Sequence, residues 1–154
     1  MAYHYTLRLV GIKGESEVEQ HQGEIDVDEV LQGYEAPSEL DKITLLDRSN
    51  IKPAVQCEGL TVISKYEEST PNLLLFLTEG KQIDEGSVYC FGSDNQVFLT
   101  IDMKQLIVRK VKTQLEKERA KVEINFSYAE IDHTYTPEGA KKALFNYKKE
   151  IPFA

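Results

Sequence analysis

The sequence has few of the residues from which most catalytic and metal centres are built. Its 154 residues include two cysteines, three histidines and no tryptophan. Cys57 and Cys90 have neither the spacing of zinc or redox motifs nor the number needed for a disulfide framework, so we expect two ordinary thiols. His4, His21 and His133 contain no pair at helical metal-ligand spacing. The composition therefore predicts no metal and no cofactor.

Basic residues and long apolar runs are also scarce. The chain has 18 Lys and Arg against 26 Asp and Glu, a net charge of −8. Nucleic-acid-binding domains normally have the opposite balance, so we expect no nucleic-acid partner. No apolar run approaches the ~20 residues that cross a bilayer, and the N-terminus lacks the basic and apolar regions of a signal peptide. We therefore expect a chain made in the cytoplasm, with no membrane insertion and no cleaved signal.

What the sequence does have is a segregated charge. Residues 1–60 contain 5 basic and 12 acidic side chains, and within them residues 15–47 contain 11 acidic and one basic. Residues 104–121 contain 7 basic and 2 acidic side chains. Opposite charges on one small domain can meet across two copies of the chain, and two solvated faces of a monomer are the alternative.

Alternating apolar and polar residues predict β-strands over much of the chain. Every second residue from Tyr3 to Leu9 is apolar, and the same period recurs from Lys121 to Ile131. Gly92–Asn95 is a polar turn that joins two such runs into a hairpin. The predicted strands are residues 3–9, 24–28 (reaching as far as Tyr34), 59–65, 86–91, 96–102, 105–113 and 121–131.

The clearest helix signal follows residue 68. Ser69 or Thr70 can cap the N-terminus, Pro71 suits the first helical position, and Gly80 suits a left-handed stop. A helix of about ten residues does not persist in water unless it docks on other structure. A second, amphipathic helix is predicted over Ala140–Lys149.

These elements predict one domain spanning residues 1–154. Six to eight strands and one short helix are typical of an antiparallel β-barrel with the helix packed on its side, or of a tight sandwich. Residues 35–57 lack a sustained period and are interpreted as an extended loop, with a short strand or a helical turn near Ile43–Leu46. Residues 140–154 form a C-terminal tail.

The sequence offers weak support for catalysis. Ser127, Asp132 and His133 resemble the members of a triad, but Ser127 does not stand in a Gly-x-Ser-x-Gly turn. The Gly11–Ser16 turn lacks the Gly-Lys-Ser/Thr ending of a phosphate-binding loop. We therefore predict that the protein is not an enzyme. A hydrolase that uses His133, and a monomeric barrel that binds a small apolar ligand, are the alternatives.

Several blocks resemble one family in order and spacing. Leu9–Ser16, with its Gly-Glu-Ser turn, and the following His21-Gln22-Gly23 are similar to the opening of the Hcp (haemolysin-coregulated protein) family. Thr61–Lys65 followed by Glu68–Leu73 resembles the family's strand and its Ser-Pro-x-Leu helix start. Lys121–Ile131, with a trailing Tyr135, resembles the final strand. The resemblance covers about residues 5–139.

The resemblance implies a specific function without catalysis. Hcp proteins are β-barrels with a helix on the side that assemble into homo-hexameric rings. The rings stack into the inner tube of the type VI secretion apparatus, next to sheath and spike components, and can carry effectors in the lumen. The tube is expelled, so the resemblance implies a bacterial cytoplasmic protein that is then secreted.

Charge segregation and the resemblance together suggest which residues make subunit contacts. The 35–57 loop lies where the family makes contacts between stacked rings, and we expect the acidic 15–47 region to face the basic 104–121 region of a neighbouring ring. The predicted ring-stacking or subunit-contact residues are Glu39, Asp41, Asp47, Arg109, Lys110, Lys112, Lys117 and Arg119.

Overall fold

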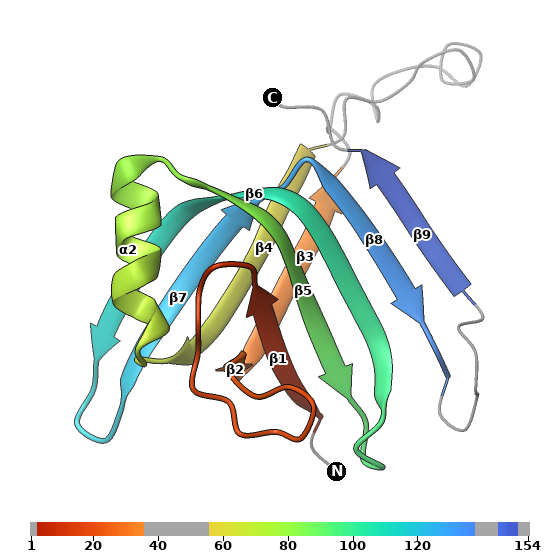
Figure 1. The fold of residues 1–154 in the computed structure, drawn as a ribbon, viewed down its shortest axis with the longest axis horizontal. Coiled ribbons are helices and arrows are strands. Elements are labelled where there is room, and N and C mark those ends of the chain that lie inside the picture. Colours follow the sequence, from red (N-terminus) through yellow and green to blue (C-terminus); the bar gives the residue numbers. More distant parts are fainter. Residues whose placement is uncertain (1–2, 36–55, 138–144, 151–154) are drawn as a thin grey trace.

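The computed structural model describes residues 3–35, 56–137 and 145–150. These residues form a strongly bent antiparallel sheet with one helix along its side (Figure 1). The elements in chain order are β1 His4–Leu9, β2 Ile25–Val27, β3 Glu29–Glu35, β4 Gln56–Lys65, α2 Ser69–Glu79, β5 Gln82–Phe91, β6 Val97–Leu115, β7 Ala120–Ser127, β8 Glu130–Tyr135 and β9 Phe145–Glu150. The prediction of a mainly β, antiparallel fold with a helix is confirmed.

The sheet has the strand order β2-β1-β5-β6-β7-β4-β3, and β8 and β9 branch from it. The branch arises at β6, which is 19 residues long. Along one edge, its first half pairs with β8 from Leu99 to Lys104 and its second half pairs with β7 from Ile107 to Leu115. Figure 1 shows β8 and β9 on the side of the molecule away from α2.

The two ends of the strand order, β2 and β3, are consecutive along the chain. Asp28 alone separates them, and its N–H donates a hydrogen bond to the carbonyl of Ile63 in β4 at 2.7 Å. β2 pairs with β1, and β3 pairs with β4. No ladder between β2 and β3 closes the sheet within the described residues.

The core lies on the inner face of the bent sheet, as the alternation predicted. In β7, Val122, Ile124 and Phe126 are fully buried, and the residues between them are half-buried. Burying such a side chain stabilises the fold by about 1.5–3 kcal/mol. The largest fully buried side chains are Phe126, Leu7, Ile25, Leu60, Leu73, Ile83, Met103, Leu106, Ile124, Ile131, Val62 and Val88.

Tertiary pairing changes two of the predicted strand boundaries. Residues 96–102 and 105–113 are a single strand, because β5 pairs with β6 on both sides of Gln105, whose φ of 54° is absorbed as a local irregularity. The predicted strand 121–131 is two strands, since pairing with β4 ends at Phe126, β7 ends at Ser127, and the Ala129 N–H donates to the carbonyl of Lys104. The hairpin across Gly92–Asn95 is confirmed.

The helix is confirmed, but its predicted N-cap is wrong. Ser69 and Thr70 lie inside the first turn, and the N-cap is Glu68, which makes no side-chain capping hydrogen bond. Pro71 is therefore the third helical residue. The Ser69 hydroxyl is instead used by the carboxylate of Glu67, to which it donates at 2.6 Å.

The C-terminal end of α2, unlike its N-terminal end, is where the sequence predicts it. Gly80 has φ 66° and forms the predicted left-handed C-cap, where its N–H donates to the carbonyl of Leu77. Leu73 anchors the helix in the core and is fully buried. A side chain with that burial supplies the docking that so short a helix requires.

The predicted C-terminal helix is wrong where the structure describes it. Residues 145–150 form β9, which pairs with β8 from Tyr135↔Phe145 to Glu130↔Glu150. Phe145 and Tyr147 are two apart, which fits one face of a strand, whereas the three-residue spacing of Leu144 and Tyr147 fits one face of a helix. The predicted 35–57 loop and the start of the tail fall mainly on residues 36–55 and 138–144, which lie outside the described residues.

Candidate subunit-contact surface

The basic residues expected at subunit contacts lie on the hairpin formed by β6 and β7. Residues 107–115 pair with residues 120–127, with a bulge between Val108 and Lys110. The turn closes with a 2.8 Å hydrogen bond from the Glu116 N–H to the Arg119 carbonyl. The turn therefore comes at residues 116–119.

The bulge determines which face each cation occupies. Beyond it, Val111 lies opposite the buried Ile124 on the core face, whereas Lys110 and Lys112 lie opposite Asn125 and Glu123 on the outer face. Side chains alternate between the faces of a strand, so these two lysines point away from the core. The structure thus places Lys110 and Lys112 together on the outer face.

Two of the five cations have partners within the hairpin. Lys110 Nζ lies 2.6 Å from Glu123 Oε2, and this hydrogen bond and charge lower the pKa of Glu123. Arg119 Nε lies 3.4 Å from Glu116 Oε2 within the turn. No ion pair joins Arg109, Lys112 or Lys117 to another described residue. All three side chains are exposed.

The acidic side of the expected contact is described in part. Glu39, Asp41 and Asp47 lie outside the described residues. The described acidic residues begin in the N-terminal loop, residues 10–24, where Glu15, Glu17 and Glu19 are exposed. This loop passes in front of β1 in Figure 1 and leads into β2.

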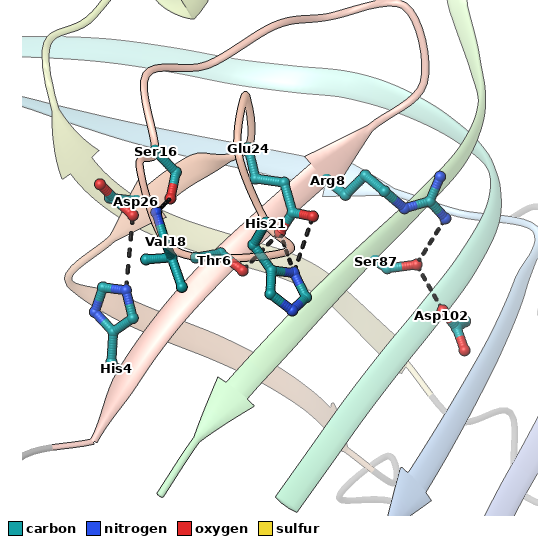
Figure 2. A network of polar contacts seen from close by, with 10 residues as sticks. All are labelled: His4, Thr6, Arg8, Ser16, Val18, His21, Glu24, Asp26, Ser87 and Asp102. Carbon is teal, nitrogen blue, oxygen red and sulfur yellow. Dashed lines mark hydrogen bonds and ion pairs between the residues drawn. The ribbon is translucent and has the colours of Figure 1, made fainter. Parts of the chain in front are cut away.

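One carboxylate of the N-terminal loop is buried and serves the fold. Glu24 accepts a hydrogen bond from the Thr6 hydroxyl at 2.7 Å, and His21 Nδ1 lies 3.0 Å from both of its oxygens (Figure 2). The His21 ring packs against Tyr89 and Phe91, with ring centroids 4.7 and 4.9 Å away. The His21-Gln22-Gly23 motif thus marks a clasp that holds the loop on β1 and β5, which sequence reasoning did not identify.

A second attachment joins the N-terminal loop to the start of α2. The buried Glu67 carboxylate accepts the Glu15 N–H at 3.3 Å, and the Glu15 carboxylate accepts the Glu68 N–H at 2.8 Å. Burial raises the pKa of Glu67, although its hydrogen bonds from Ser69 and Glu15 oppose this. The loop is therefore fixed at both ends.

The acidic loop and the basic hairpin both reach the connection between β4 and α2. Glu15 makes its two backbone-to-carboxylate hydrogen bonds with Glu67 and Glu68 there. The Tyr66 N–H donates to the Ala120 carbonyl at 2.9 Å. One chain therefore presents both signs of charge around residues 66–68.

The outer face of the sheet also carries a cross-strand polar row. Arg8 donates to the Ser87 hydroxyl at 3.1 Å, and Ser87 donates to Asp102 at 2.5 Å, which links β1, β5 and β6 (Figure 2). A shallow pocket of about 230 Å³ lies over this row, with Lys104 among its lining residues. Most of its lining residues are charged, which does not suit the apolar ligand of the monomeric-barrel alternative, and buried side chains occupy the inner face of the sheet.

The structure gives the hydrolase alternative no assembled site. His133 lies in β8 opposite Ile101, and burial lowers its pKa, with Asp132 opposing the shift. Ser127 lies at the end of β7 opposite Ile107. Among residues that the structure describes, no three His, Cys, Asp or Glu side chains gather in a metal-binding group, and no helix is long and apolar enough to span a membrane.

Comparisons with known proteins agree with this fold. The chain is 25% identical over 148 residues to protein hcp1 of Pseudomonas aeruginosa, covering 93% of this chain and 89% of that protein. Among solved structures, Hcp1 from Salmonella typhimurium has a TM-score of 0.77 at 21% identity and covers 96% of this chain and 93% of its own. A type VI secretion system effector from Yersinia pestis has a TM-score of 0.76 at 20% identity, covering 96% and 99%. The family model described as "Type VI secretion system effector, Hcp" matches residues 6–135, and the chain therefore belongs to the Hcp family.

Proposed function

We propose that the chain is the tube subunit of a type VI secretion apparatus. Homo-hexameric rings of the chain stack into an inner tube, next to sheath and spike components, and leave the cell with the tube. The match of residues 6–135 to the Hcp family carries this proposal. The absence of an assembled catalytic triad among the described residues is compatible with a structural role.

The bent sheet closes into a barrel in this proposal. β2 pairs with β1 and β3 pairs with β4, while Asp28 alone separates β2 from β3. The segment 25–35 therefore bridges the two sides of the sheet, and the hydrogen bond from Asp28 to Ile63 holds its bend. A barrel of this kind removes the exposed edges that β2 and β3 would otherwise present.

In this proposal the ring forms through the outer edge of β9. Among the described strands, β9 pairs with β8 alone, and no described strand pairs with its other edge. Such edges attract other strands unless they are covered. A head-to-tail interface around a six-fold axis covers the same edge in every copy and then closes.

Charge steers one copy onto the next. The basic β6–β7 hairpin, with Arg109, Lys112 and Lys117 unpaired among the described residues, contacts the acidic 15–47 region of a neighbouring ring. The acidic residues of this contact include Glu39, Asp41 and Asp47. Complementary fields favour this register and disfavour head-to-head stacking. Effectors are carried in the lumen of the assembled tube.

The mass of the particle in solution tests the proposal. Size-exclusion chromatography with light scattering should give six times the 17.6 kDa of the chain, and negative-stain images should show rings. A strict monomer at micromolar concentration would rule out the proposed function. A smaller closed oligomer would refute the hexamer.

A further inference from the structure

The core face of three strands continues beyond the core at the end of the hairpin. Val122 pairs with Ser64 of β4 and with Thr113 of β6, and the next position outward is Ala120, which pairs with Leu115. Tyr66 follows the same register, since its N–H donates to Ala120. Directly opposed residues share a face, so Tyr66, Ala120 and Leu115 form one row on the core side.

This row is apolar, and its two large side chains are exposed. In the row one step inward Val122 and Ser64 are 0% and 1% exposed and Thr113 is exposed, whereas Leu115 is 78% and Tyr66 43% exposed. Leu115 is the most exposed large hydrophobic residue that the structure describes. The two side chains thus form an extension of the core that the described part of the chain leaves open to solvent.

Charged residues lie around this apolar row. Lys121 and Lys65 pair with each other on the adjacent outward-facing row, and the turn next to Leu115 contains Lys117 and Arg119 together with Glu116 and Glu118. An apolar centre with a charged rim is the usual anatomy of a protein interface. The basic excess of residues 104–121, with 7 basic and 2 acidic side chains, repels another basic hairpin and is complementary to residues 1–60, with 12 acidic and 5 basic side chains.

We propose that Leu115 and Tyr66 are the apolar anchor by which one copy of the chain docks onto the acidic side of a second copy. This inference rests on the proposed function and specifies the contact further. The apolar pair supplies the affinity, because a few buried apolar or aromatic side chains dominate binding energy. The cations supply steering and register, and their contribution is screened by salt.

The two contributions separate in a salt series on the full chain. Association is measured by analytical ultracentrifugation at about 0.1 M and about 1 M salt, where the Debye length falls from about 10 Å to about 3 Å. Leu115→Ser should weaken association about tenfold at both concentrations. Lys117→Gln should weaken it at the lower concentration, and the difference from wild type should vanish at the higher one.

Leu75→Ser is the matched control. Leu75 is 52% exposed, but it lies on α2, outside both the acidic 15–47 region and the basic 104–121 region. Its replacement should leave association unchanged. Equal weakening by Leu75→Ser and Leu115→Ser would overturn the proposal, because any exposed leucine would then have the same effect.

Two further outcomes are decisive. If wild type assembles and Leu115→Ser assembles equally well, the anchor is wrong while the tube function stands. If Leu115→Ser lowers the melting temperature of the protein without changing association, the row is covered within one chain and the inference fails. A monomeric wild type would instead refute the proposed function itself.

Discussion

Lys110 Nζ lies 2.6 Å from Glu123 Oε2, so one of the most prominent cations of the hairpin is already paired within its own chain. Lys112, two residues further along the same face, lies opposite Glu123 in the ladder but forms no ion pair with a described residue. Two neighbouring lysines on one face therefore have different roles. Lys110 stabilises the hairpin, and Lys112 is available to a neighbour.

Charge reversal distinguishes these roles. We expect Lys112→Glu to leave rings intact and to block their stacking at low salt, because it places a carboxylate against an acidic neighbour. Stacking of wild-type rings should also weaken as salt rises, since exposed charges are screened beyond a Debye length of about 8 Å at physiological ionic strength. Sedimentation of tubes against rings measures both effects.

Lys110→Glu is the comparison for that experiment. It removes the bond to Glu123 and sets two carboxylates against each other, so its main effect should be on the thermal stability of the hairpin. Tubes that respond neither to Lys112→Glu nor to salt would contradict the electrostatic account of stacking.

Gly59 and Gly80 both have positive φ, but only one has space for a side chain. At Gly59 (φ 75°) a Cβ would overlap the carbonyl oxygen of Phe126, while at Gly80 (φ 66°) nothing lies within 4 Å of a Cβ. Gly80→Ala should cost roughly 1 kcal/mol, the usual penalty of the left-handed conformation. Gly59→Ala should cost roughly 2 kcal/mol more, because β4 must move away from β7. Denaturant unfolding of both variants gives the comparison, and equal losses would show that the backbone relaxes freely.

Ionisation of Glu67 should make the stability of the fold depend on pH. Burial raises its pKa above the ordinary 4.5, so the folded state binds its proton more tightly than the unfolded state does. The resulting stabilisation is complete below pH ~4.5 and is lost as pH rises through the raised folded pKa. Glu67→Gln should flatten the melting temperature in that window while keeping an acceptor for Ser69. A variant that retains the full slope would assign the dependence to other groups.

The hydrogen bonds of Glu24 should make a large contribution to the free energy of unfolding. Glu24→Ala leaves the fully buried Thr6 hydroxyl without its acceptor, and an unsatisfied buried donor costs about 1–3 kcal/mol. Thr6→Val in the same background should recover part of the loss, since it removes that donor. Glu17→Ala, an exposed carboxylate of the same loop, should change the unfolding free energy by less than about 0.5 kcal/mol. Urea titration of the wild type, the two single variants, the double variant and the Glu17→Ala control tests the coupling, and additive losses would exclude it.

Local signals in the sequence determined much of this protein. The period-two runs of β1 and β7, the turn at Gly92–Asn95 and the stop at Gly80 depend on residues close together in the chain, and all are found in the structure. The resemblance to Hcp proteins could likewise be found from the sequence, because a family is recognised by short motifs and their spacing.

Only the tertiary structure decided which of these segments join and what they bury. β6 runs through Gln105 because β5 pairs on both sides of it, and residues 145–150 become a strand because β8 offers an edge. The burial of Glu24 and the alignment of Tyr66 with Leu115 depend on pairings between distant segments. The free energy of these pairings and of this burial comes from contacts between residues that are far apart in the sequence, so no local sequence pattern predicts them.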